Sequence, residues 1–162
     1  QAFTFDIQKA NPKTIRMMEQ IEGDPFAVSL HVRRGDYLQP EHWNAIGCVC
    51  QLPYYQHALA EMNSRVKEAS YYVFSDDLDW VRQHLHLAKA TYMDWNRGAD
   101  SWQDMMLMSH CRHHIICNST FSWWGAWLNP RLDKQVLVPD RWFNNTDAPF
   151  IYPSGWTKVP TR

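Results

Sequence analysis

The sequence has 162 residues, of which 45% are hydrophobic and 20% are charged, a composition typical of a folded domain with a sizeable core. Its formal net charge of −1 argues against the broad positive surface that nucleic-acid binding requires, although one phosphate site needs only one or two cations. There is no apolar run of about eighteen residues, so we predict no membrane span, and the first residues show no signal-peptide pattern.

The first predicted element is a helix that begins at Asn11 and Pro12 and ends near Gly23. Asn11 can cap the helix, and proline is tolerated in its first turn. Three apolar residues have the spacing of one buried helix face: Ile15, Met18 and Ile21. We assign residues 1–25, including this helix, to a linking region that precedes a domain over residues 26–162.

Short β-rich runs then alternate with helical patterns. The predicted strands cover residues 26–32, 71–74, 90–93, 113–117 and 135–138. The predicted helices follow Pro53, cover 78–86 and 101–112, and lie between Phe121 and Asn129. Asp100 and Gln103 have the spacing of a capping box for the helix over 101–112. Residues 37–52 have no period and predict a loop, and the tail over 139–162 predicts an extended segment that wraps the domain.

This alternation predicts an α/β fold. Strands separated by helices of about ten to fifteen residues indicate βαβ units and a parallel sheet. Because the crossovers of such sheets are right-handed, we expect a Rossmann-like, doubly wound parallel sheet.

The sequence contains four cysteines: Cys48, Cys50, Cys111 and Cys117. The first two are too close in sequence for easy disulfide geometry. A zinc site built from the cysteines with His113 and His114 is an alternative, but the spacing fits no standard zinc pattern. Reduced cysteines, and hence a cytosolic setting, are the simpler interpretation.

Three polar clusters follow predicted strands. They are His31 with Arg33-Arg34-Gly35-Asp36, then Ser75-Asp76-Asp77, then Asn118-Ser119-Thr120-Phe121. Ligands of a doubly wound sheet bind outside the carboxyl ends of its strands, so the three clusters should share one edge.

These residue types suit a nucleoside diphosphate. A guanidinium grips phosphate oxygens in a fork and stays charged. Ser119 and Thr120 stand where a helix begins, and hydroxyls and free N–H groups there favour an anion. A carboxylate accepts paired hydrogen bonds from a guanine edge or a ribose, and Asp76 and Asp77 are the candidates.

Each cluster also has a purely structural interpretation. Arg33 and Arg34 could form an ion pair with Asp36. The aspartates and hydroxyls could only cap helices, and His31 could be a satisfied core histidine. Arg34-Gly35-Asp36 is also the tripeptide of integrin-binding loops, which an adhesion module would expose on a loop tip.

Four segments resemble one enzyme family. The run from His31 to Tyr37 resembles the H-x-R-R-x-D motif of α-1,2- and α-1,6-fucosyltransferases and related O-fucosyltransferases. Residues 72–77 resemble the second block of the α-1,2-fucosyltransferases. Residues 117–128 resemble their third block and are the most specific of these segments. The ending over residues 151–156 is similar to that of a bacterial member.

The resemblance implies the donor-binding half of an α-1,2-fucosyltransferase of glycosyltransferase family 11, with a GT-B-type fold. Such enzymes are inverting and metal-independent, so no cofactor is expected. The implied donor is GDP-fucose and the implied acceptor is the 2-hydroxyl of a galactose-containing glycan. Family members also have a second, N-terminal half of similar size that helps to hold the acceptor.

The resemblance also implies roles for the clusters. Arg33 would contact the β-phosphate and stabilise the leaving GDP, Arg34 would orient the loop and support the substrate site, and Asp36 would fix the arginines. His31 would contact the nucleotide or act as a base, and nucleotide contact is favoured. Further substrate contacts are expected from Ser75, Asp76, Asp77, Asn118, Ser119, Thr120 and Phe121.

We expect a bacterial source, a cytoplasmic location and peripheral association of the full enzyme with the inner membrane surface, in polysaccharide or glycan synthesis. The alternative from another class is a non-catalytic module that binds a nucleotide or a glycan, and a fucose-transfer assay discriminates the two.

Overall fold

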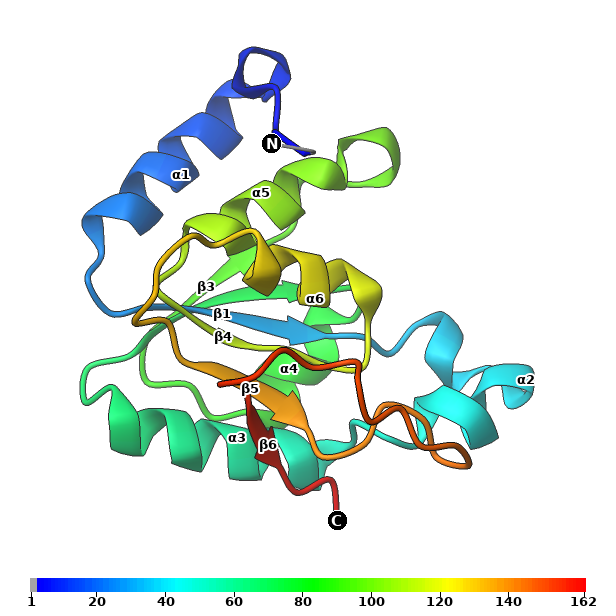
Figure 1. The fold of residues 1–162 in the computed structure, drawn as a ribbon. Coiled ribbons are helices and arrows are strands. Elements are labelled where there is room, and N and C mark those ends of the chain that lie inside the picture. The colour runs from blue at the N-terminus through cyan, green and yellow to red at the C-terminus, as the bar shows by residue number, and fades with distance from the viewer. Residues whose placement is uncertain (1–2) are drawn as a thin grey trace.

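The computed structural model describes residues 3–162 and contains a six-stranded sheet (Figure 1). Its strands are β1 (Ala27–Val32), β2 (Ser70–Ser75), β3 (Ala90–Met93), β4 (His113–Ile115), β5 (Val136–Pro139) and β6 (Thr157–Val159). The spatial order is β3-β2-β1-β4-β5-β6, and every neighbouring pair is parallel. This order is that of a Rossmann sheet, so the predicted fold class is confirmed.

Helices cover both faces of the sheet, as the doubly wound prediction requires. The longer ones are α1 (Pro12–Gly23), α3 (Leu52–Arg65), α4 (Leu78–His84), α5 (Trp102–His110) and α6 (Thr120–Trp127). Figure 1 shows α1, α5 and α6 on one face and α3 on the other. Val81 and Leu85, at α4, share a core cluster with α3, which places α4 on the α3 side.

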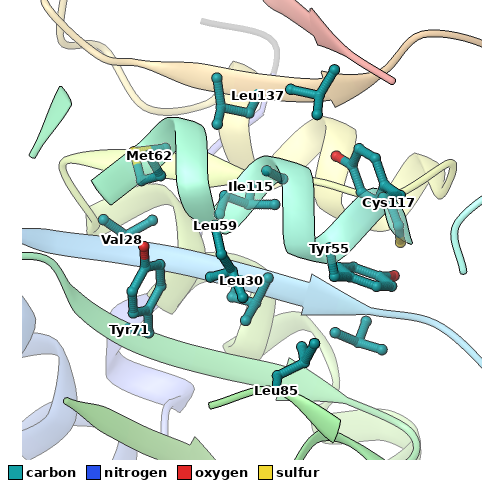
Figure 2. Close-up of a cluster of buried hydrophobic side chains, with 14 of the residues drawn as sticks. Val28, Leu30, Tyr55, Leu59, Met62, Tyr71, Leu85, Ile115, Cys117 and Leu137 are labelled. Atoms are coloured by element: carbon teal, nitrogen blue, oxygen red, sulfur yellow. The ribbon is translucent and has the colours of Figure 1, made fainter. Parts of the chain in front are cut away.

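The larger core lies between α3 and the sheet. Strand β1 is buried along its whole length, and alternate residues serve opposite faces. Val28, Leu30 and Val32 join the α3 side, whereas Ala27 joins the α1 and α5 side. Figure 2 shows α3 side chains lying over β1, β2, β4 and β5; the labelled residues of α3 are Tyr55, Leu59 and Met62. Full burial of one such apolar side chain contributes about 1.5–3 kcal/mol.

Helix α1 forms as predicted and packs against α5. The Asn11 side chain accepts a hydrogen bond from the Thr14 backbone N–H at 2.8 Å, and Pro12 occupies the first turn. Ile21 is fully buried in the cluster that contains Tyr72 of β2 and Leu107 of α5. Residues 12–23 therefore share a core with the sheet.

Two segments differ from the sequence prediction. Residues 37–52 are not a plain loop, because they contain η2 (Asp36–Leu38), α2 (Pro40–His42) and the π-helical η3 (Trp43–Gly47). Such short turns are closed by local hydrogen bonds and leave no hydrophobic period. The tail contains β6, which pairs in parallel with β5 at the sheet edge. Three residues are too few to show strand alternation in sequence.

The predicted capping box of α5 does not form. The helix begins at Trp102 after Ser101, whose side chain makes no capping bond, while Asp100 lies in the short turn η4 (Gly98–Asp100). The Gln103 amide donates to Asp100 at 3.1 Å, and its carbonyl oxygen accepts from the Asn11 backbone N–H at 2.9 Å. Gln103 therefore joins α5 to the start of α1.

Polar side chains form a hydrogen-bond network inside the sheet, centred on His114 of β4. This side chain is fully buried, and its Nδ1 lies 2.7 Å from the Ser29 hydroxyl of β1. Its Nε2 accepts from the Asn129 amide at 2.9 Å. Both ring nitrogens are therefore satisfied within the fold, and burial lowers the pKa of His114 to about 3.

Candidate functional site

The topology of the sheet fixes the place of the site. The chain extends the sheet outwards from β1 through β2 to β3, then returns to β4 on the other side of β1. The segments that follow β1 and β4 diverge at this switch point, which is where open α/β sheets bind ligands. Val32 of β1 pairs in register with Ser75 of β2, so the first two predicted clusters lie side by side.

An open cleft of about 810 Å³ lies at this edge of the sheet. Of the predicted site residues, six line it: His31, Arg33, Ser75, Asp76, Asp77 and Phe121. The other five do not line it: Arg34, Asp36, Asn118, Ser119 and Thr120. The structure thus brings residues of all three clusters together, with part of each cluster used elsewhere.

Arg33 is held by two carboxylates at the mouth of the cleft. Its Nη2 lies 2.9 Å from Asp36 Oδ1, and its Nε lies 3.3 Å from Asp76 Oδ2. Burial lowers the pKa of Arg33, but Asp76 and Asp36 more than offset this effect, and the net shift is upwards. Asp36 thus pairs with Arg33 but not with Arg34, whose partner is Asp77, and Nη1 of Arg33 has no hydrogen-bond partner among residues 3–162.

Arg34 turns away from the cleft. Its guanidinium lies 4.1 Å from the centre of the Trp80 ring, its Nε lies 3.4 Å from Asp77 Oδ2, and its side chain is only 14% exposed. This packing supports the loop and covers Arg34, whereas Gly35 and Asp36 are exposed, so an adhesion tripeptide would lack an accessible arginine. The Arg34 backbone N–H also donates to Asp76 at 2.8 Å.

The loop between Arg34 and Asp36 requires glycine because of its close approach to Asp76. A Cβ atom at Gly35 would overlap the Asp76 carboxylate. That carboxylate cannot move freely, because it accepts from the Arg34 backbone and pairs with Arg33. The tight packing of loop and carboxylate therefore sets the position of Arg33.

Asp77 and Ser75 shape the turn into α4. Asp77 Oδ1 accepts from the Trp80 backbone N–H at 3.1 Å, which is an N-cap bond. The Ser75 hydroxyl accepts from the Asp77 backbone N–H at 2.9 Å. The capping interpretation thus describes part of the role of Asp77, although both side chains also line the cleft.

His31 lies at the inner wall of the cleft. It is 5% exposed, and its ring centre is 5.7 Å from that of Phe121. Burial, together with the charge of Arg33, lowers the pKa of His31 to about 3. The ring is therefore neutral at physiological pH and a weak base, which favours nucleotide contact over general-base catalysis.

The third cluster divides between the cleft and the fold. The Asn118 amide donates to the Ile46 and Trp142 carbonyls, both at 3.0 Å, and so ties η3 and the tail to the end of β4. Ser119 is the N-cap of α6, but its side chain makes no capping bond. Thr120 begins the helix and is exposed. Only Phe121 reaches the cleft wall.

Sequence reasoning missed a second arm of the cleft. This arm follows β3 and is lined by Asp94, Asn96, Arg97, Gly98, Ser101 and Asp104. The available signal was the polar run after the third strand, which ends at the same edge as the other clusters. Asp104 itself lies inside the helical pattern of α5, which gives no sign that its side chain faces a cleft.

Asp104 is a partly buried carboxyl group on this arm of the cleft. Burial raises its pKa to about 6, against the opposing hydrogen bond from Asn96. The Asn96 amide donates to Asp104 Oδ1 at 2.8 Å, and its own oxygen accepts from Asn11 at 3.0 Å. A network that includes Thr14 of α1 thus holds the Asp104 carboxylate at the cleft wall.

Two further properties concern the described part of the chain. Residues 3–162 contain no group of three His, Cys, Asp or Glu side chains that could hold a metal ion, and the four cysteines are free thiols. Within the same residues, no helix combines the length and the apolar character needed to cross a membrane.

The fold and the cleft define a Rossmann-like α/β domain with a ligand site at the switch point of its sheet. Residues 12–159 match the sequence model of "Glycosyl transferase family 11", and the chain belongs to that family.

Proteins similar to this chain carry names of the same class. The O-antigen biosynthesis glycosyltransferase WbnK of Escherichia coli is 38% identical over 132 residues, which are 81% of this chain and 44% of that protein. The alpha-1,2-colitosyltransferase of Escherichia coli is 31% identical over 137 residues, 82% of this chain and 47% of that protein. Galactoside alpha-(1,2)-fucosyltransferase 1 of Saimiri boliviensis boliviensis is 34% identical over 105 residues, 62% of this chain and 28% of that protein. The chain thus spans less than half the length of these relatives.

Proposed function

We propose that this chain binds GDP-fucose for an inverting glycosyltransferase that transfers fucose to the 2-hydroxyl of a galactoside. The observation that carries the proposal is the switch-point cleft, in which Arg33 is held by Asp36 and Asp76 with Nη1 left free. Family membership and the names of the relatives support the reaction class. The acceptor and the complete active site belong to the whole protein, of which this chain is the donor-binding part.

Arg33 stabilises the leaving group in this proposal. The bond between fucose and the β-phosphate breaks as the acceptor oxygen attacks from the opposite side, and negative charge collects on the departing diphosphate. A fixed guanidinium aimed at those oxygens supplies the stabilisation without a metal ion. Asp36 and Asp76 keep the guanidinium oriented, so little reorganisation is needed when the charge develops.

We place base recognition in the second arm of the cleft. A carboxylate accepts two hydrogen bonds from the guanine edge, and Asp104 is the lining carboxylate whose position is set by Asn96 rather than by an arginine. Asp76 and Asp77 already accept bonds from Arg33, Arg34 and the α4 backbone. They remain candidates for the ribose hydroxyls, because both line the cleft.

The acceptor base is not assigned to this chain. His31 is too weak a base at neutral pH for that role, because its pKa is lowered to about 3. The proposed role of His31 is contact with the nucleotide.

Arg33→Ala is the direct test, made in the full-length enzyme. We expect the transition state to lose about 3–4 kcal/mol of stabilisation, a decrease in transfer rate of roughly a hundred- to a thousandfold. The matched control is Arg16→Ala, which removes an exposed guanidinium from α1. Unchanged transfer by the Arg33 variant contradicts the proposal. The same assay with EDTA is expected to show full activity, and a loss restored by Mn²⁺ or Mg²⁺ contradicts the metal-free mechanism.

Calorimetric titration tests the donor site separately. GDP and GDP-fucose are expected to bind without added metal, and ADP and UDP to bind more weakly. Asp104→Asn should reduce this preference for GDP. Selective binding of GDP by an enzyme that transfers no sugar favours the alternative, a non-catalytic nucleotide-binding module. Because one relative is named a colitosyltransferase, the transfer assay compares fucose and colitose as the donor sugar.

A further inference from the structure

His31 has one ring nitrogen bonded inside the fold and one left for the cleft. Its Nδ1 lies 3.3 Å from the Cys117 sulfur. Its Nε2 has no hydrogen-bond partner within residues 3–162, although the side chain is 95% buried and forms part of the cleft wall. Among the described residues, the buried side-chain atoms without a partner do not include His31 Nε2, so this nitrogen is open to the cleft and can bond a ligand there.

The surroundings of Cys117 decide which atom donates in this contact. Burial raises the pKa of the Cys117 thiol to about 12, against smaller opposing hydrogen bonds from Ser122 and the Arg33 backbone amide. The sulfur therefore keeps its hydrogen at neutral pH. The Ser122 hydroxyl is 3.9 Å away and donates its own hydrogen to the Ser119 carbonyl at 3.4 Å. The imidazole nitrogen is both the nearer and the more basic acceptor for the thiol hydrogen.

We propose that Cys117 is a positioning residue that selects the ring tautomer of His31, so that Nε2 carries the hydrogen and donates to an oxygen acceptor of the bound nucleotide. The proposal rests on the proposed function, since it takes a nucleoside diphosphate as the occupant of the cleft. A neutral imidazole has one N–H, and the thiol hydrogen on Nδ1 leaves that N–H at Nε2. The opposite tautomer would turn a lone pair towards the ligand and repel its oxygens.

The two buried histidines make the proposal measurable, because the structure assigns them opposite tautomers. In His114, Nε2 accepts from Asn129, so Nδ1 carries the hydrogen and donates to Ser29. Long-range ¹H–¹⁵N NMR spectra distinguish the two forms directly. His114 therefore serves as an internal reference for the opposite state in the same sample.

The experiment compares the wild type with Cys117→Ser and Cys117→Ala in NMR spectra and in GDP titrations. We expect the wild type and Cys117→Ser to hold His31 with hydrogen on Nε2, since a hydroxyl can also donate. Cys117→Ala should give a mixture of tautomers and weaken GDP binding about tenfold, as loss of an oriented bond to a charged group predicts. The matched control is Cys111→Ala, because Cys111 is also buried but contacts the Leu107 carbonyl instead of His31.

The outcomes separate this proposal from the proposed function. Hydrogen on Nδ1 of His31 in the wild type overturns the proposal, and so does a Cys117→Ala variant with unchanged tautomer and GDP affinity. A wild type with hydrogen on Nε2 that binds no GDP contradicts the nucleotide as occupant, and with it the proposed function. Thermal unfolding of each variant verifies that Cys117→Ala is folded, and Cys117→Ser provides the test if it is not.

Discussion

His31 and His114 lie on neighbouring strands, and the fold uses them differently. Both are at least 95% buried, and burial lowers the pKa of each to about 3. His114, in the middle of the sheet, has partners for both nitrogens in Ser29 and Asn129. His31, at the carboxyl end of β1, has a partner only for Nδ1. Burial and pKa are thus alike in the two residues, and only the free Nε2 of His31 distinguishes it as the proposed contact for a ligand.

The largest expected effect comes from His114→Ala. The substitution leaves a cavity and removes the partner of the Ser29 hydroxyl and one partner of the Asn129 amide, so the free energy of unfolding should fall by about 4 kcal/mol. His31→Ala removes only the hydrogen-bond partner of the Cys117 thiol. It should lower the free energy of unfolding by about half as much and should also weaken GDP binding. Urea denaturation of both variants measures the difference. Equal losses of stability would contradict the distinction between the two histidines.

Stability should also decline in acid because of these two residues. Each histidine has its pKa lowered from 6.5 to about 3, so between these values the unfolded chain binds a proton that the folded chain does not. Each thus removes about 1.4 kcal/mol per pH unit as the pH falls from 6.5. Asp104 acts in the opposite direction between about 6 and 3.8, since its raised pKa lets the folded state bind the proton first.

Between pH 6 and pH 4, the histidines and Asp104 act in opposite directions on the free energy of unfolding. Asp104 cancels one of these two histidine contributions, which leaves a loss of about 1.4 kcal/mol per pH unit, and His113, whose pKa burial also lowers, adds to it. Asp104→Asn should make the slope steeper by about 1.4 kcal/mol per pH unit, because it removes the compensating proton. Urea titrations at several pH values measure both slopes. Identical slopes in the wild type and the variant would show that these groups do not control acid stability.

The smallest expected effect concerns the N-termini of α4 and α6, where one side chain makes a capping bond and the other makes none. Asp77 makes an N-cap bond to α4, whereas the Ser119 side chain makes none to α6. Asp77→Ala should cost about 1 kcal/mol of stability, and Ser119→Ala less than about 0.5 kcal/mol. Asp77→Asn preserves the cap and is the matched control, so it isolates the loss of the charge that faces Arg34. Chemical denaturation tests these values, and an equal cost for both alanine variants would remove the distinction.

Much of the fold followed from local pattern. The strand and helix alternation predicted a parallel sheet, and the rule on carboxyl strand ends predicted that His31, Arg33, Asp76 and Phe121 would meet at one edge, as they do. The pattern failed for β6 and for the turns over residues 36–47, because elements this short show no period. It also passed over Asp104, since a residue inside a helical pattern gives no local sign that it faces a cleft.

The sequence by itself thus determined the order of the longer helices and of β1 to β5, the sheet edge at which the polar clusters meet and the family to which the chain belongs. The tertiary structure decided which polar atoms the fold uses and which remain free. It turned Arg34 towards Trp80, used Asn118 to tie η3 to the tail, and paired Cys117 with His31. The physical reason is that hydrogen bonds and ion pairs join residues far apart in the chain, whereas sequence periodicity reports only on which face of its own element a residue lies.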